Sequence, residues 1–322
     1  MKTNEVMTEV QLIADALAKK SKKTLASNRP ALIEQAKFFA PEYRDFILKI
    51  IKSSALKIES KPNGGSISDI DPSHYLRLNY TKRRKYKIIT DIENVRTLPH
   101  ELGHAVDFWF HILLPSSSFV NAVNNQTLYD VFTAEFNSKY EEFYTMIMNE
   151  YEAIITANID ENTFALIRDN IEKYRELKSI KIDKKNKETT AKRRALQKTL
   201  YECNFVETYF NIHEQYYFKE FNNKYAPILD ALSSKYDLSH IFLAHHKKEY
   251  YDLSMFLPVQ EFFANAFRDK VTANEESIAN LKKYLPASYA AFENLFYMFY
   301  DRLQNNKKFT DVELIGCNIS EK

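Results

Sequence analysis

The chain has 322 residues, which is enough for a sizeable core, and its 45% apolar content is typical of a folded protein. Its 4 glycines leave few positions for tight β-turns, which argues against an all-β fold and a glycine-rich phosphate loop. A formal net charge of +2 and 2 cysteines give no support for a nucleic-acid-binding protein, a disulfide scaffold or a Cys-x-x-Cys metal site. We therefore expect a mainly α, α+β fold.

Residues 1–60 are expected to form an N-terminal helical region. Apolar residues recur there at spacings of three and four, first over 6–17 and again over 32–51. Residues 1–20 lack the apolar core of a signal peptide, and no stretch of the chain reaches the roughly 18 apolar residues of a membrane span. The sequence therefore predicts a soluble protein without a membrane partner.

A glycine-containing turn at 62–66 separates this region from a stretch with a different periodicity. His74–Tyr80 alternates apolar and polar residues, and Tyr86–Thr90 is a second short apolar stretch. Together they predict a small β-hairpin. A strand at the edge of a sheet can align an extended peptide by backbone pairing, and a purely structural hairpin is the alternative.

The segment Thr97–Leu114 predicts a helix that follows the hairpin. Pro99 suits a first helical turn, an apolar stripe continues along the segment, and Pro115 ends it. Gly103 is unfavourable inside a helix by about 1 kcal/mol relative to alanine. A close approach of another group to the backbone would explain it, and a neighbouring strand with bound substrate is one candidate.

This helix contains the motif H-E-x-x-H over residues 100–104. Residues four apart lie on the same helix face, so His100 and His104 can direct both imidazoles at one metal ion. Glu101 is adjacent to the first ligand and can act as general base on a metal-bound water. The pattern is typical of zinc metallopeptidases, in which one helix supplies two ligands and the base.

Two further stretches, 119–177 and 200–236, predict helices rich in aromatic residues. The segment between them, 178–198, is strongly basic and poor in apolar residues, and it predicts an exposed linker followed by a solvated helix start. A nucleic-acid patch is the weaker alternative, because no aromatic residues are interleaved with the lysines and arginines.

A catalytic zinc needs a third protein ligand, which must come from outside the motif. Spacing alone does not select among the downstream glutamates, namely Glu135, Glu141, Glu142, Glu150, Glu202, Glu207, Glu214, Glu249 and Glu261. Context favours Glu261, because a short helix that begins after Pro258 surrounds this carboxylate with phenylalanines. A buried carboxylate needs a partner, such as a metal. An ordinary exposed helix glutamate is the alternative.

The two blocks together resemble a known family. His100–Asp107 (HELGHAVD) and Glu261–Arg268 (EFFANAFR) are similar to the catalytic domain of the anthrax lethal factor-like zinc peptidases, which are gluzincins of the H-E-x-x-H type. The Asp-Pro-Ser and Leu-Asn pattern within 71–79 also resembles the strand region before that family's active-site helix.

The resemblance implies a zincin-like metallopeptidase domain over 61–114 and 250–322, with a helical insertion over 115–249 that contains the basic linker 178–198. It implies Zn²⁺ as cofactor and names as its ligands His100, His104 and Glu261. It also implies that Glu101 is the general base.

The chain departs from the family pattern at two positions. The family's active-site tyrosine lies seven residues before the ligand glutamate, which is Ser254 here. Tyr251, or its neighbour Tyr250, is the candidate for stabilising the oxyanion, with core packing as the alternative. The family's second acidic residue is replaced by Asn265. Asp107 has two explanations, which are the orientation of a ligand imidazole and an ordinary surface or capping role.

The leading hypothesis is a zinc-dependent endopeptidase that hydrolyses peptide bonds of a protein or peptide substrate. One alternative is a non-catalytic helical interaction module on a zincin scaffold, but an intact Glu101 argues against it, since a structural site needs no base. Another is an effector whose insertion binds a protein or nucleic-acid partner.

Members of the resembled family occur in toxins and in proteins of phages and mobile elements. The resemblance therefore implies a toxin or effector role, with the protein cytoplasmic in the producing cell or delivered from it. The substrate and the oligomeric state do not follow from these patterns.

Overall fold

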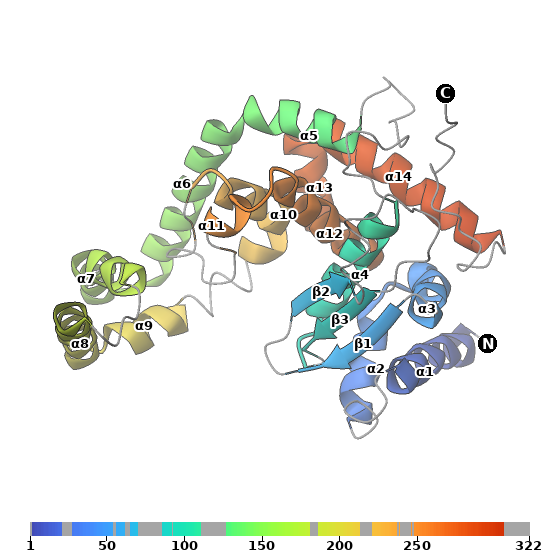
Figure 1. Cartoon of the computed structure of the whole chain (residues 1–322), viewed down its shortest axis with the longest axis horizontal. Coiled ribbons are helices and arrows are strands. Elements are labelled where there is room, and N and C mark those ends of the chain that lie inside the picture. The colour runs from blue at the N-terminus through green and yellow to red at the C-terminus, as the bar shows by residue number, and fades with distance from the viewer. Residues whose placement is uncertain are drawn as a thin grey trace. The chain divides into compact units, whose positions relative to one another are not determined.

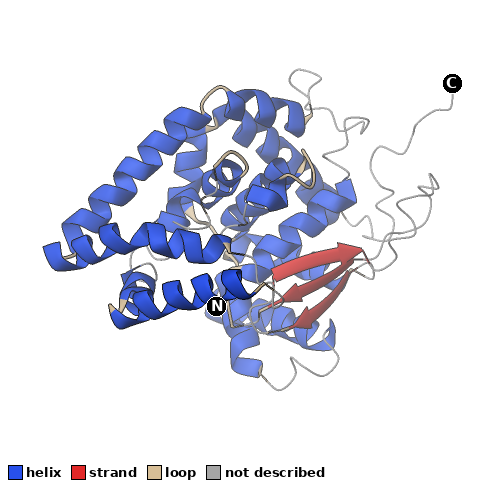
Figure 2. Ribbon diagram, turned by 60° about the vertical axis from the view of Figure 1, so that its left-hand side comes forward, coloured by secondary structure: helices blue, strands red, loops and turns tan. Residues whose placement is uncertain are grey.

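A computed structural model of the chain describes residues 2–20, 28–53, 56–61, 65–69, 86–91, 93–110, 127–180, 186–212, 221–236, 238, 246 and 248–305. Most of these residues are helical, and three short strands form one sheet (Figures 1 and 2). The expected mainly α, α+β fold is confirmed at this level. None of the described helices offers the long apolar stretch that a bilayer crossing needs.

The chain divides into two compact units, one formed by Met1–Ser138 with Phe256–Lys322 and the other by Lys139–Met255. The described elements of the first unit are α1 (Lys2–Lys20), α2 (Arg29–Phe38), the 3₁₀ helix η1 (Pro41–Tyr43), α3 (Arg44–Lys52), β1 (Leu56–Ser60), β2 (Gly65–Asp69), β3 (Tyr86–Thr90), α4 (Thr97–Phe110), α5 (Leu128–Asn137), α12 (Leu257–Val271), α13 (Glu275–Tyr284) and α14 (Pro286–Gln304). Those of the second are α6 (Tyr140–Asn158), α7 (Glu161–Ser179), α8 (Lys187–Glu202), α9 (Phe205–Ile212), α10 (Asn222–Ser233) and α11 (Lys248–Tyr251).

The sheet has the strand order β1-β3-β2. β1 is parallel to β3, with Leu56 opposite Tyr86, and β2 is antiparallel to β3, with Gly65 opposite Thr90. The predicted strand Tyr86–Thr90 is confirmed, but its predicted hairpin partner, 74–80, lies outside the described residues. Among the described strands, β2 is the antiparallel neighbour of β3 and lies at an edge.

The N-terminal helical region is shorter than the sequence predicted, because α3 ends at Lys52 and residues 56–60 form β1. Leu56 and Ile58 are buried there, whereas Lys57 and Glu59 are exposed. This alternation has period two, as expected for a strand with one face on the core. The prediction of helix up to residue 60 was wrong for these five residues.

Aromatic side chains build the core of the first unit around α12 and α14. Phe46 of α3 contacts Phe267 of α12 with ring centroids 6.2 Å apart, and Phe296 of α14 at 5.6 Å. Phe132 of α5 lies 4.8 Å from Phe262 of α12. Helix α4 packs against α12 and against strands β2 and β3. Helix α4, which contains the H-E-x-x-H motif, therefore packs against both a helix and the sheet.

Helix α5 belongs to the first unit, although the sequence placed it in a helical insertion over 115–249. Its Glu135 accepts hydrogen bonds at the start of α14 from the backbone of Ala287 and Ser288, at 3.2 and 2.8 Å, and from the Ser288 hydroxyl at 2.6 Å. A carboxylate at a helix N-terminus satisfies backbone N–H groups that have no partner within the helix.

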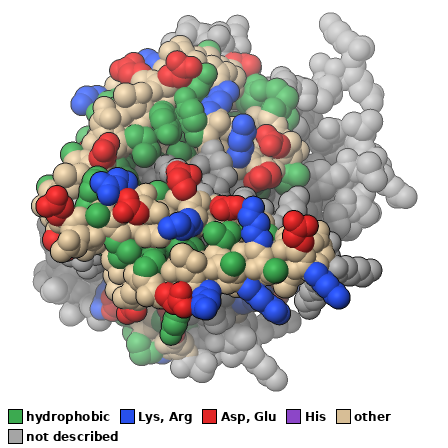
Figure 3. All heavy atoms as spheres, turned by 90° about the vertical axis from the view of Figure 1, so that its left-hand side faces the viewer, with side chains coloured by type: hydrophobic (Ala, Val, Ile, Leu, Met, Phe, Trp, Pro, Cys, Tyr) green, Lys and Arg blue, Asp and Glu red, His purple; other side chains and the backbone are tan. Residues whose placement is uncertain are grey.

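The second unit contains a small core of its own, formed by residues of α7, α8 and α9. Its buried members are Tyr174, Leu177, Leu200, Phe205 and Tyr209. Helix α8 begins at Lys187 after an N-cap by Asn186, so much of the basic segment 178–198 is helical. Acidic partners lie beside some of its charges, as in the Lys192–Glu176 ion pair of 2.6 Å. Figure 3 shows lysine, arginine, aspartate and glutamate side chains interspersed on one face of the molecule.

Candidate metal centre

Three side chains of the first unit bring metal-binding atoms to one point. His100 and His104 come from α4, and Glu261 comes from α12. The Nε2 atoms of the two histidines are 3.1 Å apart, and Glu261 Oε2 lies 3.3 Å from the first and 3.5 Å from the second. These are the residues that the sequence named as metal ligands.

The spacing of the three donor atoms fits a small tetrahedral ion. In a tetrahedral site with bonds of about 2.0–2.1 Å, ligand atoms are separated by about 3.3 Å. The three observed separations of 3.1, 3.3 and 3.5 Å lie around that value. Two imidazoles and a carboxylate can therefore hold a metal ion here without moving apart.

The centre lies at the margin of the core. The side chains of Glu261 and His104 are 2% and 9% exposed, whereas that of His100 is 18% exposed. His100 is therefore the most exposed of the three side chains.

Gly103 allows α4 to approach α12 closely enough to form this centre. A Cβ atom at this position would lie 2.8 Å from the Cα atom of Ala264 and 2.9 Å from its carbonyl oxygen. Contacts so short with backbone atoms are not tolerated, so any larger residue would separate the helices. The close approach predicted at Gly103 is confirmed, and the neighbour is a helix backbone rather than a strand with substrate.

The charges of the centre are strongly coupled. Burial lowers the pKa of His104, but the nearby carboxylates of Glu261, Glu101 and Asp107 outweigh this effect and raise its pKa to about 9. Burial alone would raise the pKa of Glu261, but the two histidines hold it well below its usual value. Without a metal ion, the positive charge beside Glu261 is therefore that of a protonated His104.

Glu101, the candidate base, is 4% exposed and belongs to α4, which contacts β2 and β3. A Cβ atom at Gly65 of β2 would come within 3.6 Å of Glu101 Oε1. The start of β2, an edge strand among those described, therefore lies beside the carboxylate that follows the first candidate ligand.

Asp107 is buried at 1% exposure, so the surface role considered for it is wrong. Burial raises the pKa of its carboxyl well above the usual value, and the charge of His104 opposes this only in part. Neither carboxylate oxygen has a hydrogen bond among the described residues. Its role in orienting a ligand imidazole stays a prediction.

Tyr251, the candidate oxyanion stabiliser, belongs to the second unit. Its hydroxyl donates to Asp230 Oδ1 at 3.3 Å, and its neighbour Tyr250 stacks on His246 with ring centroids 3.9 Å apart. These contacts lie within that unit, and a role for Tyr251 in catalysis stays a prediction.

The structure provides other roles for two rival glutamates. Glu135 accepts the hydrogen bonds at the start of α14 described above. Glu150 accepts a hydrogen bond of 2.6 Å from the hydroxyl of Tyr225 and lies 3.8 Å from Lys224 Nζ. Glu261 is the glutamate that the described structure places beside both histidines.

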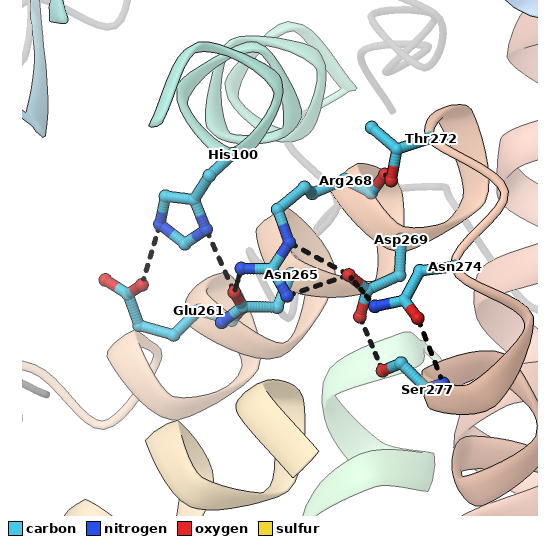
Figure 4. Close-up of polar contacts among 8 residues, drawn as sticks. All are labelled: His100, Glu261, Asn265, Arg268, Asp269, Thr272, Asn274 and Ser277. Atoms are coloured by element: carbon cyan, nitrogen blue, oxygen red, sulfur yellow. Dashed lines mark hydrogen bonds and ion pairs between the residues drawn. The ribbon is translucent and has the colours of Figure 1, made fainter. Parts of the chain in front are cut away.

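The polar network behind the centre (Figure 4) extends from Asn265, which the sequence placed on the same helix face as Glu261, to Arg268 and Asp269, which were not anticipated. The Nδ1 atom of His100 lies 3.2 Å from Asn265 Oδ1, which also accepts from Arg268 at 2.8 Å. Arg268 in turn pairs with Asp269. The signal was present as an Arg-Asp pair in an otherwise apolar helix, where buried charges require partners.

Comparisons with protein-family models, curated proteins and solved structures returned no match for this chain.

Proposed function

We propose that this protein is a zinc-dependent endopeptidase in which His100, His104 and Glu261 hold Zn²⁺. The spacing of the three donor atoms, with Glu101 next to the first ligand, is the observation that carries the proposal. Two imidazole nitrogens and a carboxylate oxygen suit zinc, and three protein donors leave the fourth tetrahedral position for water or substrate, as in catalytic sites.

Each residue has a distinct task in this proposal. Zinc, when bound, supplies a Lewis acid that polarises the scissile carbonyl and lowers the pKa of a neighbouring water. Glu101 accepts a proton from the attacking water and returns it to the leaving amine as general base and then general acid. The edge of β2 pairs with the backbone of an extended substrate and places the scissile bond near Glu101.

The number of donor atoms does not favour the alternative of a non-catalytic module on the same scaffold. A structural zinc site fills four positions with protein ligands. The described residues supply three such ligands, and the carboxylate of Glu101, next to the first of them, is buried.

A Glu101→Gln substitution tests the proposal. The variant is expected to bind about one zinc per chain, as the parent does, because glutamine is close in shape and no ligand is lost. Cleavage of a peptide library should fall about 10²- to 10⁴-fold, since proton transfer by a positioned base contributes this much. Zinc is measured by elemental analysis and cleavage by mass spectrometry.

The exposed Glu93, which precedes α4, offers the matched control. Glu93→Gln makes the same chemical change and is expected to leave zinc and cleavage at parent levels. A parent without bound metal would refute the centre itself. A zinc-loaded Glu101→Gln chain that cleaves at the parent rate would remove Glu101 as base, and a zinc-loaded parent without cleavage would favour the interaction module.

A further inference from the structure

We propose that Arg268 acts as a positioning residue that selects the metal-binding tautomer of His100 through the side-chain amide of Asn265. The inference rests on the proposed metal centre and concerns a residue one step removed from any ligand. Asn265 is 1% exposed and lies between Arg268 and His100 (Figure 4).

The first step concerns the orientation of the amide. Arginine carries only donors, so the Asn265 atom that faces the Arg268 Nη1 atom at 2.8 Å must be the oxygen. The other end of the amide is consistent with this, since Asn265 Nδ2 donates to the backbone carbonyl of Glu261 at 3.0 Å. Partners of opposite kind at the two ends therefore fix which way the amide points.

The second step concerns the imidazole. His100 Nδ1 lies 3.2 Å from the same Asn265 oxygen, which is an acceptor. The nitrogen that faces it must therefore carry the proton. In the neutral ring this leaves the lone pair on Nε2, which is the atom that faces His104 and Glu261. The network thus prepares the nitrogen that a metal requires.

The third step shows why Arg268 can perform this task. Its Nε and Nη2 atoms lie 2.9 and 2.8 Å from Asp269 Oδ1, and its side chain is only 11% exposed. Asp269 is in turn held by the Ser277 hydroxyl of α13, which donates to Oδ2 at 2.6 Å. The guanidinium is therefore anchored to the junction of α12 and α13 rather than free to rotate.

Without Arg268, the Asn265 oxygen would lose a charged donor, and the amide would turn over more readily against the remaining bond from Nδ2 to the Glu261 carbonyl. An amide presents an oxygen at one end and an NH₂ group at the other. If the NH₂ group faced His100 Nδ1, that nitrogen would become the acceptor and Nε2 would carry the proton. His100 Nε2 could then bind a metal ion only after the amide had turned back. The free energy of this rotation would make the free energy of metal binding less favourable.

Zinc competition titrations on the full chain test this coupling. Arg268→Met and Asn265→Ala are each expected to weaken zinc binding about ten- to hundredfold, the usual effect of groups that orient metal ligands. The double variant should bind no more weakly than Asn265→Ala alone, because Arg268 acts through the amide. Additive losses in the double variant would instead indicate a general structural role and would overturn the inference.

Lys270 provides a matched control on the same helix. Its side chain is also 11% exposed and forms an ion pair with Glu293 at 2.7 Å. Lys270→Met therefore removes an equally buried cation from α12 and is expected to leave zinc affinity within about twofold of the parent, well below the loss expected for groups that orient a ligand. A loss as large as that of Arg268→Met would contradict the assignment.

Nitrogen-15 NMR of the histidine rings gives a readout that a structural role would not change. With ¹¹³Cd²⁺ as the bound probe, the parent should show metal coupling at His100 Nε2 and a proton on Nδ1. Arg268→Met should lose this slowly exchanging Nδ1 proton, and Arg268→Lys, which keeps a donor for Asn265, should restore it.

If Arg268→Met does not fold, the parent spectrum and Arg268→Lys still decide. Coordination through Nδ1 in the parent would overturn the inference, as would an Arg268→Lys chain without the Nδ1 proton. A parent that binds neither cadmium nor zinc would refute the metal centre. Tight binding by the parent and by a folded Arg268→Met variant would refute only the role of Arg268.

Discussion

His104 can bind either a proton or a metal ion with the same buried nitrogen. The carboxylates around it raise its pKa to about 9 in spite of its burial, so near pH 7 the metal-free side chain is charged and paired with Glu261. A metal ligand must be neutral, so zinc has to displace this proton. The same carboxylates that attract the metal ion also strengthen the binding of the competing proton to His104.

We expect the metal-free protein to lose stability as the pH rises from about 6.5 to about 9. The pKa of His104 is raised from 6.5 in the unfolded chain to about 9 in the folded one. Its contribution is therefore complete below pH 6.5 and is lost as the pH passes 9, with a magnitude on the order of 3 kcal/mol. Denaturant unfolding at several pH values measures it.

His104→Asn should remove most of that pH dependence, whereas His246→Asn, a change in the second unit, should retain it. Parent and His104→Asn curves that run parallel over this range would show that His104 is not paired with Glu261 in solution.

The three candidate metal ligands could be predicted from the sequence because their signals are local. The spacing of His100 and His104 specifies one helix face, and the proline-led aromatic helix singles out Glu261. The positioning role that we propose for Arg268 could not be predicted in this way. It depends on a hydrogen bond between His100 and Asn265, which are 165 positions apart, and hence on how two helices pack.

At the scale of elements, the contact of α4 with α12 determines whether the centre exists. Gly103 is expected to be irreplaceable there, although alanine favours a helix by about 1 kcal/mol. The added Cβ atom would meet the Cα atom of Ala264 at 2.8 Å, and overpacking of this kind costs about 1–3 kcal/mol. Gly103→Ala should therefore lower the melting temperature and weaken zinc binding, because the helices must separate.

Gly65→Ala is the matched control for that substitution. Among the described residues, a Cβ atom at Gly65 would meet the end of the Thr97 side chain, at 3.3 Å, and the oxygen of Glu101, at 3.6 Å. Its zinc affinity should equal that of the parent. A Gly103→Ala chain with unchanged affinity and stability would mean that α4 and α12 are not in close contact.

The strands show where element prediction from sequence fails. β3 was recognised because it is a compact apolar stretch, whereas β1 was assigned to the preceding helical region. Five residues are too few to establish a period of two when a helical pattern runs up to them. The pairing of β1 with β3 joins residues 30 positions apart, as in Leu56 with Tyr86, and no local pattern specifies it.

At the scale of the whole molecule, the second unit lies in the sequence between the two segments that supply the candidate metal ligands. Residues 139–255 separate the histidines from Glu261 in the sequence, yet all three donors, the candidate base and the positioning residues belong to the first unit. The sequence predicted a helical insertion from the distance between the two motifs. It could not show that α5 packs in the first unit, because the contacts of Glu135 with α14 span 152 and 153 positions.

This division predicts where zinc stabilises the chain. A ligand that binds only the folded state adds about 4 kcal/mol when its free concentration is a thousand times the dissociation constant. Since every donor lies in the first unit, hydrogen exchange should slow on zinc addition in α4, α12 and α13, which α12 anchors through Asp269. Helices α7, α8 and α9 have a separate core and should exchange as before. Glu261→Ala, which lacks a donor, should show no zinc effect, and an equal slowing in α7–α9 of the parent would show that the two units unfold as one.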